Sequence, residues 1–566
     1  LVMPAPGWAL AGISGKLRAN EQGGQIEVDA EEGLLRLPWL FRADLRPTRT
    51  EGIFAWKSVP AGMQLYTDDL RISNAEIQTR TRLSVTLPRS GSPFIDVKAR
   101  VVASSAPAVV NHLPLVLFGK PLVKWLDESI ITGRVPKGEL TWRGPLRAFP
   151  YDEGDGEFRV EFSVEDGVLD YAPGWPRLED VSTTVVIDHN SLSSVENSGT
   201  IAGVPFRDAQ VRVADLMHKP ELQLGTADDM QVGQLLAFLR ASPIAQTLGP
   251  TLNNVSGRGN VATAVQLSMP IARPRDFRVT GSFETSGASL GLRGVAYRLT
   301  DLKGLIRLDN TRLSAEKLSG QFLDEPVAIS LRPAGKDEPD LSHVAGLRGA
   351  TPVDKLAAAF SLPYAGRLDG AVSWAATARV PKDKDQQPFR IEIESDLAGL
   401  VSTLGAPLQK AAATQEPLQL SVLFPERDQV DVSGRIKRGI SWALRFGSAP
   451  GTPWQLERGA LRSGGPLASL PGVPGIEIAG SFQGLRFEDW FPASDGGTTA
   501  ANAPGGNGAI RQIFIDVESF SIFGQLFRDV SIKAAHAGRR WAIGVRGRNT
   551  EGSITVPDVL SADTPL

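Results

Sequence analysis

The sequence predicts a mainly β protein in which strand meanders repeat and short amphipathic helices are few. Two observations predict this fold class. Apolar and polar residues alternate over many short segments, which is the period of a strand that buries one face. Clusters of Gly, Asn, Asp, Ser and Pro separate these segments, as the residues of turns do.

Residues 94–103, FIDVKARVVA, illustrate the strand pattern. Isoleucine, valine and alanine fall on one face, while aspartate, lysine and arginine fall on the other. The same alternation recurs along the chain, so each such segment predicts a strand with one apolar face. The other clear segments are 83–87, 158–164, 181–187, 389–393, 513–517 and 541–545.

Three segments predict short helices, because their apolar residues recur three and four positions apart. Thr351 and Pro352 suit the cap and first turn of one helix, and Pro121 precedes another. Each helix can lay one face against a sheet, but none is long enough to cover several strands. The apolar stripes are Leu122, Trp125, Leu126 and Ile130; Val232, Leu235, Leu236 and Leu239; and Val353, Leu356, Ala357 and Phe360.

Two sequence patterns recur and predict a tandem array. A strand opening of Gly, any residue, an apolar residue, a small residue and Trp begins at Gly52, Gly138 and Gly370, and Gly257 begins a weaker copy without Trp. Units of roughly 115 residues, each a meander with one helix, explain this spacing. In the second pattern Leu178, Asp180, Gly199 and Pro205 match Leu299, Asp301, Gly320 and Pro326.

These repeats also predict the domain organisation. One stretch, SDGGTTAANAPGGNG over 494–508, is rich in Gly, Ala and Thr and predicts a flexible linker. The predicted units are 1–118, a partial first β unit; 119–231, 232–350 and 351–493, each a helix plus a β-meander; 494–508, a flexible linker; 509–557, further strands of the same array; and 558–566, a disordered tail.

The composition excludes several classes of protein. The 566 residues are 42% hydrophobic and 22% charged, which is typical of a folded, water-soluble chain of several domains. A formal net charge of -3 leaves no positive excess to hold a polyphosphate backbone, so we expect no nucleic-acid partner. The absence of cysteine excludes disulfides, zinc thiolate sites and thiol catalysis.

The beginning of the chain, LVMPAPGWAL, has neither an initiator methionine nor a basic stretch before an apolar one. The most apolar window near the first helix, Leu113 to Phe118, is far shorter than the roughly 20 residues needed to cross a bilayer. We therefore expect a segment of a longer chain, whose anchor or targeting sequence lies elsewhere.

No motif predicts catalysis, a cofactor or a metal site. The acidic stretch 151–157 lacks the alternate carboxylates of a calcium loop, so we interpret it as a turn. Ser-Gly pairs recur before strands without a nucleophile elbow or a phosphate loop around them. The five histidines are scattered, without the spacing of metal ligands. We therefore expect a protein that is not an enzyme, with no catalytic residue, no cofactor and no metal.

The one-sided strands raise the question of what covers their apolar face. Such a face packs against a second sheet, against helices or against a ligand. The predicted helices are too small for this area, and the uniform phase of the strands favours one continuous curved sheet. The pattern alone still allows an ordinary core between two sheets, as in a modular β-sandwich adhesion or binding array.

Four stretches carry a resemblance to a known family. ELTWRGPLRAFPYDEGDGEFRVEF, followed by GVLDYAPGWPRLEDV and preceded by KWLDESI, resembles the YhdP family of AsmA-like proteins, which are relatives of TamB in the Gram-negative envelope. The stretch 518–557, from ESFSIFGQLFRDVSIKAAHAGRRWAIGVRG to GSITVP, looks like the continuing array of that family. The likeness covers most of the chain and is most specific at 142–149 and 171–176.

The resemblance implies an elongated, repeating β-groove, which is a curved and mostly antiparallel sheet with one open apolar trough. It also implies a periplasmic, bridge-like lipid transfer protein that carries phospholipid between the inner and outer membranes. The implied partners are phospholipid acyl chains, the inner membrane through an anchor that this segment lacks, and outer-membrane or other envelope proteins at the ends of the groove. The implied location is the periplasm of a Gram-negative bacterium, with the parent chain anchored in the inner membrane.

Under this interpretation the inward faces of the strands line the groove. Translocation chaperoning of outer-membrane β-proteins, as for TamB-like relatives, stays open as an alternative, whereas a β-helix acting on polysaccharide is disfavoured because its coils repeat every twenty-odd residues. The repeated Trp56, Trp142 and Trp374 are interpreted as packing residues rather than lipid contacts. The expected groove-lining residues are Val97, Phe158, Val160, Phe162, Val164, Val185, Ile187, Phe283, Ile391 and Ile393.

Overall fold

The structure is a computed structural model of the whole chain. It describes residues 9–12, 14–36, 44–103, 105–112, 119–245, 250–293, 295, 297–360, 362, 364–382, 388–426, 428–436, 439–448, 454–490, 510–538 and 540–557. The predicted linker 494–508, the predicted tail 558–566 and the apolar window 113–118 lie outside these residues.

The fold is mainly β, and one long open sheet of 31 strands contains nearly all of the strands. Neighbours along the chain pair antiparallel almost throughout, while β30–β31 and β31–β32 pair in parallel. This confirms the predicted fold class. The strands as far as residue 231 are β1 (Ala9–Ala11), β2 (Gly15–Asn20), β3 (Gly23–Glu31), β4 (Leu34–Arg36), β5 (Arg49–Val59), β6 (Gly62–Ser73), β7 (Ile77–Pro88), β8 (Phe94–Ala103), β9 (Ile130–Pro145), β10 (Glu157–Leu169), β11 (Leu178–Asp188), β12 (Ser191–Ile201), β13 (Val204–Arg207), β14 (Gln210–Val213) and β15 (Glu221–Gln231).

The remaining strands continue the meander, apart from a small separate pair. That pair is β23 with β26, and a second small sheet joins β1 to β4. The later strands are β16 (Val255–Arg258), β17 (Asn260–Pro270), β18 (Arg278–Leu292), β19 (Arg298–Asp309), β20 (Arg312–Phe322), β21 (Glu325–Pro333), β22 (Leu341–Pro352), β23 (Leu368–Asp369), β24 (Ala371–Pro381), β25 (Phe389–Ser395), β26 (Val401–Ser402), β27 (Leu418–Glu426), β28 (Gln429–Ile436), β29 (Ile440–Gly447), β30 (Gln455–Ser463), β31 (Gly475–Arg486), β32 (Ile510–Ile522), β33 (Gln525–Ala537), β34 (Arg540–Gly547) and β35 (Thr550–Pro557).

The three predicted helices are confirmed, with one difference in bounds, and the described residues also contain two short helices that were not predicted. The helix predicted over 122–130 ends at Ser129, because Ile130 already begins β9. Among the described residues, no helix combines the length and the apolar character that crossing a membrane requires. The helices are α1 (Ala106–His112), α2 (Lys120–Ser129), α3 (Val232–Ala241), α5 (Val353–Phe360) and α6 (Phe487–Trp490).

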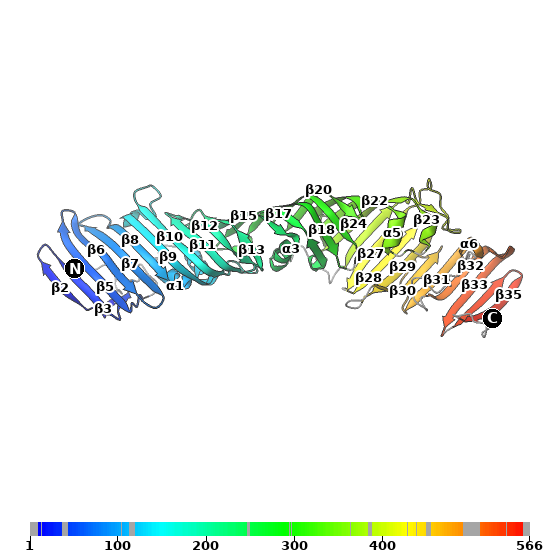
Figure 1. Cartoon of the computed structure of the whole chain (residues 1–566), viewed down its shortest axis with the longest axis horizontal. Coiled ribbons are helices and arrows are strands. Elements are labelled where there is room, and N and C mark those ends of the chain that lie inside the picture. The colour runs from blue at the N-terminus through cyan, green and yellow to red at the C-terminus, as the bar shows by residue number, and fades with distance from the viewer. Residues whose placement is uncertain are drawn as a thin grey trace. The chain divides into compact units, whose positions relative to one another are not determined.

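The chain forms two compact units. The first is Leu1–Ile244 with Val261–Phe283 and Leu308–Thr311, and the second is Ala245–Asn260 with Glu284–Arg307 and Arg312–Leu566. In the first unit, β5 to β12 lie side by side, as do β27 to β30 in the second (Figure 1).

In each unit the helices fall at one edge of the sheet. Antiparallel neighbours alternate in direction, so every second connection lies at the same edge. In the first unit α1 and α2 follow β8, and α3 follows β15, which runs in the same direction as β8. In the second unit α5 follows β22, and α6 follows β31, which runs in the same direction as β22. We call this the helix edge and the opposite side the hairpin edge.

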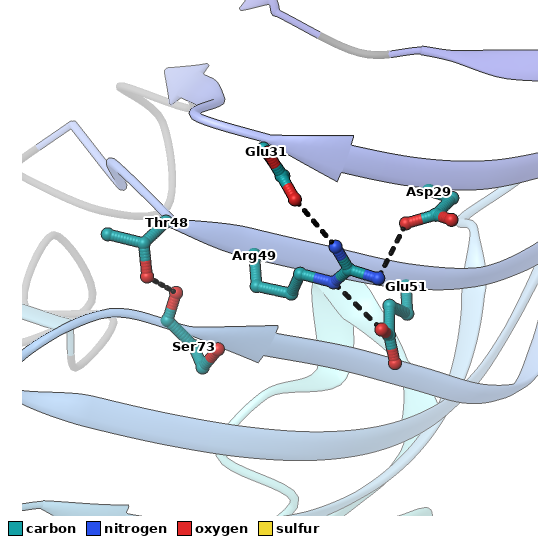
Figure 2. A network of polar contacts seen from close by, with 6 residues as sticks. All are labelled: Asp29, Glu31, Thr48, Arg49, Glu51 and Ser73. Carbon is teal, nitrogen blue, oxygen red and sulfur yellow. Dashed lines mark hydrogen bonds and ion pairs between the residues drawn. The ribbon is translucent and has the colours of Figure 1, made fainter.

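The two faces of the sheet differ sharply in polarity. The polar face carries exposed ion pairs, and Figure 2 shows one group of them near the start of the chain. Arg49 on β5 contacts Asp29 at 3.0 Å and Glu31 at 3.1 Å on β3, and Glu51 on its own strand at 2.8 Å. The hydrogen bond to Glu51 is the main reason why the pKa of Arg49 lies above its ordinary value. Each such exposed pair stabilises the fold little, but together they mark a face that stays in water.

The repeat seen in the sequence has a structural basis. Asp180 and Asp301, which match in the two copies, both adopt a left-handed backbone conformation, with φ of 53° and 48°. A β-bulge places one residue in this conformation and sharpens the bend of the strand. The matching Gly199 and Gly320 each lie against a carbonyl oxygen of the bulged strand, at 2.9 and 3.0 Å from an added β-carbon. The repeat therefore encodes the same bulge twice.

His343 on β22 is buried in the second unit, at 4% exposed, and its Nε2 accepts a hydrogen bond from the Leu313 amide at 2.9 Å. Burial lowers the pKa of His343 to about 4. Below about pH 6.5 the unfolded chain therefore binds a proton that the folded chain does not, and stability falls as the pH drops towards 4. We expect this histidine to remove up to about 3 kcal/mol of the free energy of unfolding over that range.

The matched variant is His343→Gln, which keeps an acceptor but does not titrate. Urea unfolding at pH 7 and pH 4.5 should show a smaller loss of stability for the variant than for the unaltered chain. Equal losses of unfolding free energy in the two proteins would show that His343 does not cause this pH dependence.

Candidate functional site

The apolar face of the first unit is built by cross-strand pairs. Val97 on β8 lies opposite Trp142 on β9, which lies opposite Phe158 on β10. One step along the strands, Val160 lies between Leu140 and Ile187. Partners in register share a face, so the structure brings together all seven residues that the sequence singled out in this unit before β12. They are Val97, Phe158, Val160, Phe162, Val164, Val185 and Ile187.

An aromatic cluster covers this face at the hairpin edge. The ring of Phe149 lies 5.0 Å from Phe158 and 5.6 Å from Trp142, and the indole N–H of Trp142 donates to the hydroxyl of Tyr151 at 2.9 Å. Tyr151 and Phe158 are each only 1% exposed. Gly144 and Gly156 make room for the Tyr151 ring, because an added β-carbon would come within 2.6 and 2.4 Å of it. The Trp142 of the sequence repeat is thus a packing residue here.

A second cluster covers the face at the helix edge. Ile77, Ala103 and Val135, from β7, β8 and β9, pack with Ala106 of α1 in a buried core. Phe162 and Val101 pack against this core from the side and stay half-buried. A short helix that the sequence did not predict is therefore enough to cover this end of the strands.

Between the two clusters the apolar face is only half-buried. Leu140, Val160, Val164 and Val185 all retain accessible surface. Besides the long sheet, the described residues contain only the two small two-stranded sheets, which are too short to cover it. An ordinary core between two sheets, which the sequence pattern allowed, is therefore not found among the described residues.

The second unit repeats this arrangement. Ile391 lies between Ala378 and Val422, and Ile393 lies between Ala376 and Leu420. Ile391 and Ile393 are half-buried, as predicted groove residues should be. The ladder continues across later strands, where Trp442 lies over Gly434 so closely that a β-carbon there would come within 2.4 Å of the ring.

Four of the ten predicted residues are already buried in protein. Phe158 lies under the aromatic cluster, Val97 and Ile187 are 8% and 6% exposed, and Phe283 on β18 is 4% exposed. Leu140, Leu420 and Val422 share the same face but were not among the predicted residues. The alternation in LQLSVLF over 418–424 is the signal that would have found the last two. Contact of any of these side chains with lipid stays a prediction.

The most specific family motif forms packing rather than a reactive site. The indole N–H of Trp125 donates to the carbonyl of Tyr171 at 2.8 Å, and the ring of Trp175 lies 5.2 Å from Phe277. Burial raises the pKa of Tyr171, which keeps its hydroxyl neutral. Within the described part of the chain, no group of three His, Asp or Glu side chains is placed to hold a metal ion.

Comparison with known proteins gives one result. The family model described as YhdP protein matches residues 5–564. No curated protein and no solved structure matches the chain. The matched range spans nearly the whole sequence, and it includes both units and the motifs that carried the resemblance. The chain belongs to the YhdP family, an AsmA-like lipid-transport family of the Gram-negative envelope.

Proposed function

We propose that this chain is a periplasmic part of a bridge-like lipid transfer protein that carries phospholipid along its apolar sheet face between the inner and outer membranes. The observation that carries the proposal is the half-buried apolar face, which continues from strand to strand without a second large sheet over it in the part of the chain that the structure describes. Family membership supports lipid as the cargo. Phospholipid is proposed because its two acyl chains are the apolar surface that such a face can shelter.

The free energy of exposing acyl chains to water favours transfer along a surface of apolar side chains. Burying one methylene stabilises it by about 0.8 kcal/mol, so roughly thirty acyl methylenes resist exposure to water by about 24 kcal/mol. Crossing an aqueous gap without cover is therefore very slow. An apolar face that contacts the chains throughout removes most of this barrier, and the many similar aliphatic positions avoid a tight site that would hold the lipid back.

The opposite face supports the same proposal. Ion pairs such as Arg159–Glu161 on β10 and Arg445–Asp431 between β28 and β29 hold charged side chains on the polar side of the strands. A strand with aliphatic residues on one side and ion pairs on the other has only one side that can contact acyl chains. The polar face then contacts water, and the head groups of bound lipids lie away from the sheet.

Native mass spectrometry of the purified chain tests this function. We expect phospholipid to co-purify with the chain and to be displaced when the chain is washed with a competing detergent. Recovery of unfolded outer-membrane protein in place of lipid would favour the chaperone alternative. A chain that neither retains phospholipid nor takes it up from vesicles of phosphatidylethanolamine and phosphatidylglycerol would refute the proposal.

A further inference from the structure

We infer that the apolar face across β8, β9 and β10 passes one two-chain phospholipid at a time. This inference rests on the proposed function and concerns how many lipids fit abreast. Four cross-strand rows of side chains follow one another from the hairpin edge to the helix edge in these strands. Protein covers the row at the hairpin edge on all three strands and the row at the helix edge on β8 and β9. The side chains of the inner two rows stay half-buried.

The outer rows are buried on β8 and β9. Val97, Trp142 and Phe158 form the row at the hairpin edge, beneath the aromatic cluster. On β8 and β9, Ala103 and Val135 form the row at the helix edge, beneath α1, while Val164 on β10 stays half-buried. These buried residues mark the two borders of the open face.

The inner rows form what we call the lane. One row consists of Ala99, Leu140 and Val160, which are all half-buried. In the other row Val101 and Phe162 are half-buried, and between them lies Gly138, which has no side chain and is buried. The lane thus runs across the three strands, and both of its borders are covered on β8 and β9.

The spacing of strand residues sets the width of the lane. Alternate residues on a strand are about 7 Å apart. Two open rows therefore give the lane a width of about 14 Å between its buried borders. Hydrocarbon chains in van der Waals contact lie about 4 to 5 Å apart. Two acyl chains fit side by side in this width, whereas the four chains of two lipids need more than the lane provides.

Gly138 lies at the middle of the lane floor. Gly138 is buried, and a β-carbon there would lie 3.3 Å from the carbonyl oxygen of Val101 and 3.5 Å from the β-carbon of Phe162, so the neighbours leave little room beside the backbone. Gly138 does not adopt a left-handed backbone conformation. The backbone angles therefore allow a larger residue, whose side chain has to extend past Val101 and Phe162 into the lane.

The test places an indole in the lane of the full-length parent chain. Gly138→Trp and, separately, Leu140→Trp obstruct the two rows, and Thr141→Trp on the polar face of the same strand is the matched control. The measurement is transfer of fluorescent phosphatidylethanolamine from donor to acceptor vesicles. If a lipid has no room to pass beside the obstacle, transfer falls about ten-fold or more for both lane variants and stays near the unaltered rate for the control.

The outcomes distinguish failure of the one-lipid width from failure of the proposed function. A folded lane variant that keeps more than about half of the unaltered transfer rate overturns the one-lipid width, because lipids then pass beside the indole. The proposed function survives that result, and it fails only if the unaltered chain transfers no lipid. Circular dichroism melting identifies which variants fold, and Leu140→Trp replaces a half-buried side chain, so the test remains if Gly138→Trp does not fold.

Discussion

Val160→Asp is expected to stop lipid transport by the parent chain while leaving its fold assembled. Val160 lies in register between Leu140 and Ile187 on the apolar face, and it is half-buried, so water can still reach an aspartate at this position in the empty protein. An acyl chain that passes over it must remove that water. Burying even an uncharged polar group without a partner costs about 2 to 7 kcal/mol, and a charge costs more. Because each 1.4 kcal/mol of added barrier slows a step about ten-fold, transfer should fall by at least that factor.

The matched control is Ser163→Asp on the same strand. Ser163 lies opposite Lys137 and Thr184, so its side chain is on the polar face. Both variants add one negative charge to β10, and only one of them adds it to the proposed lipid path. Vesicle transfer and the lipid content measured by native mass spectrometry should fall for Val160→Asp alone. Normal transfer in a folded Val160→Asp protein, or equal losses in both variants, would contradict the lipid path.

The face of each strand was predictable because it depends on a period of two within one segment. The alternation over 157–166 and 389–395 placed Val160 and Ile391 on the apolar side, and the cross-strand registers agree. Short amphipathic stripes likewise predicted α2, α3 and α5. These features follow from local sequence, which records where water contacts a strand or a helix.

Which apolar residues stay uncovered was not predictable in the same way. Phe158 and Val160 have the same sequence pattern, yet only Phe158 is buried, with its ring against Phe149. The cover comes from a connection whose path depends on packing with Trp142, and no periodicity reports that. Helix α1 was missed for a related reason, because its seven residues are too few to show a clear stripe.

Phe158→Ala is expected to produce the largest loss of stability on the apolar face of the first unit. Phe158 is 1% exposed, and its ring meets Trp142 edge-on at 5.7 Å and Phe149 at 5.0 Å. Removing a buried phenyl group typically costs about 3 to 5 kcal/mol, because the transfer free energy is lost and a cavity remains. The Trp142 indole is hydrogen-bonded to Tyr151 and cannot move freely to fill that cavity.

The matched control is Phe149→Ala, which removes the same phenyl group from a half-buried position in the same cluster. Its cost should be about half as large, since less surface leaves water when the protein folds. The two compact units allow more than one unfolding transition, so calorimetry should be followed for each transition separately. We expect Phe158→Ala to lower the transition of the first unit and to leave that of the second unchanged. Equal effects of the two variants would mean that the aromatic cluster does not wall off the hairpin edge, and the borders of the apolar face would then have to be sought elsewhere.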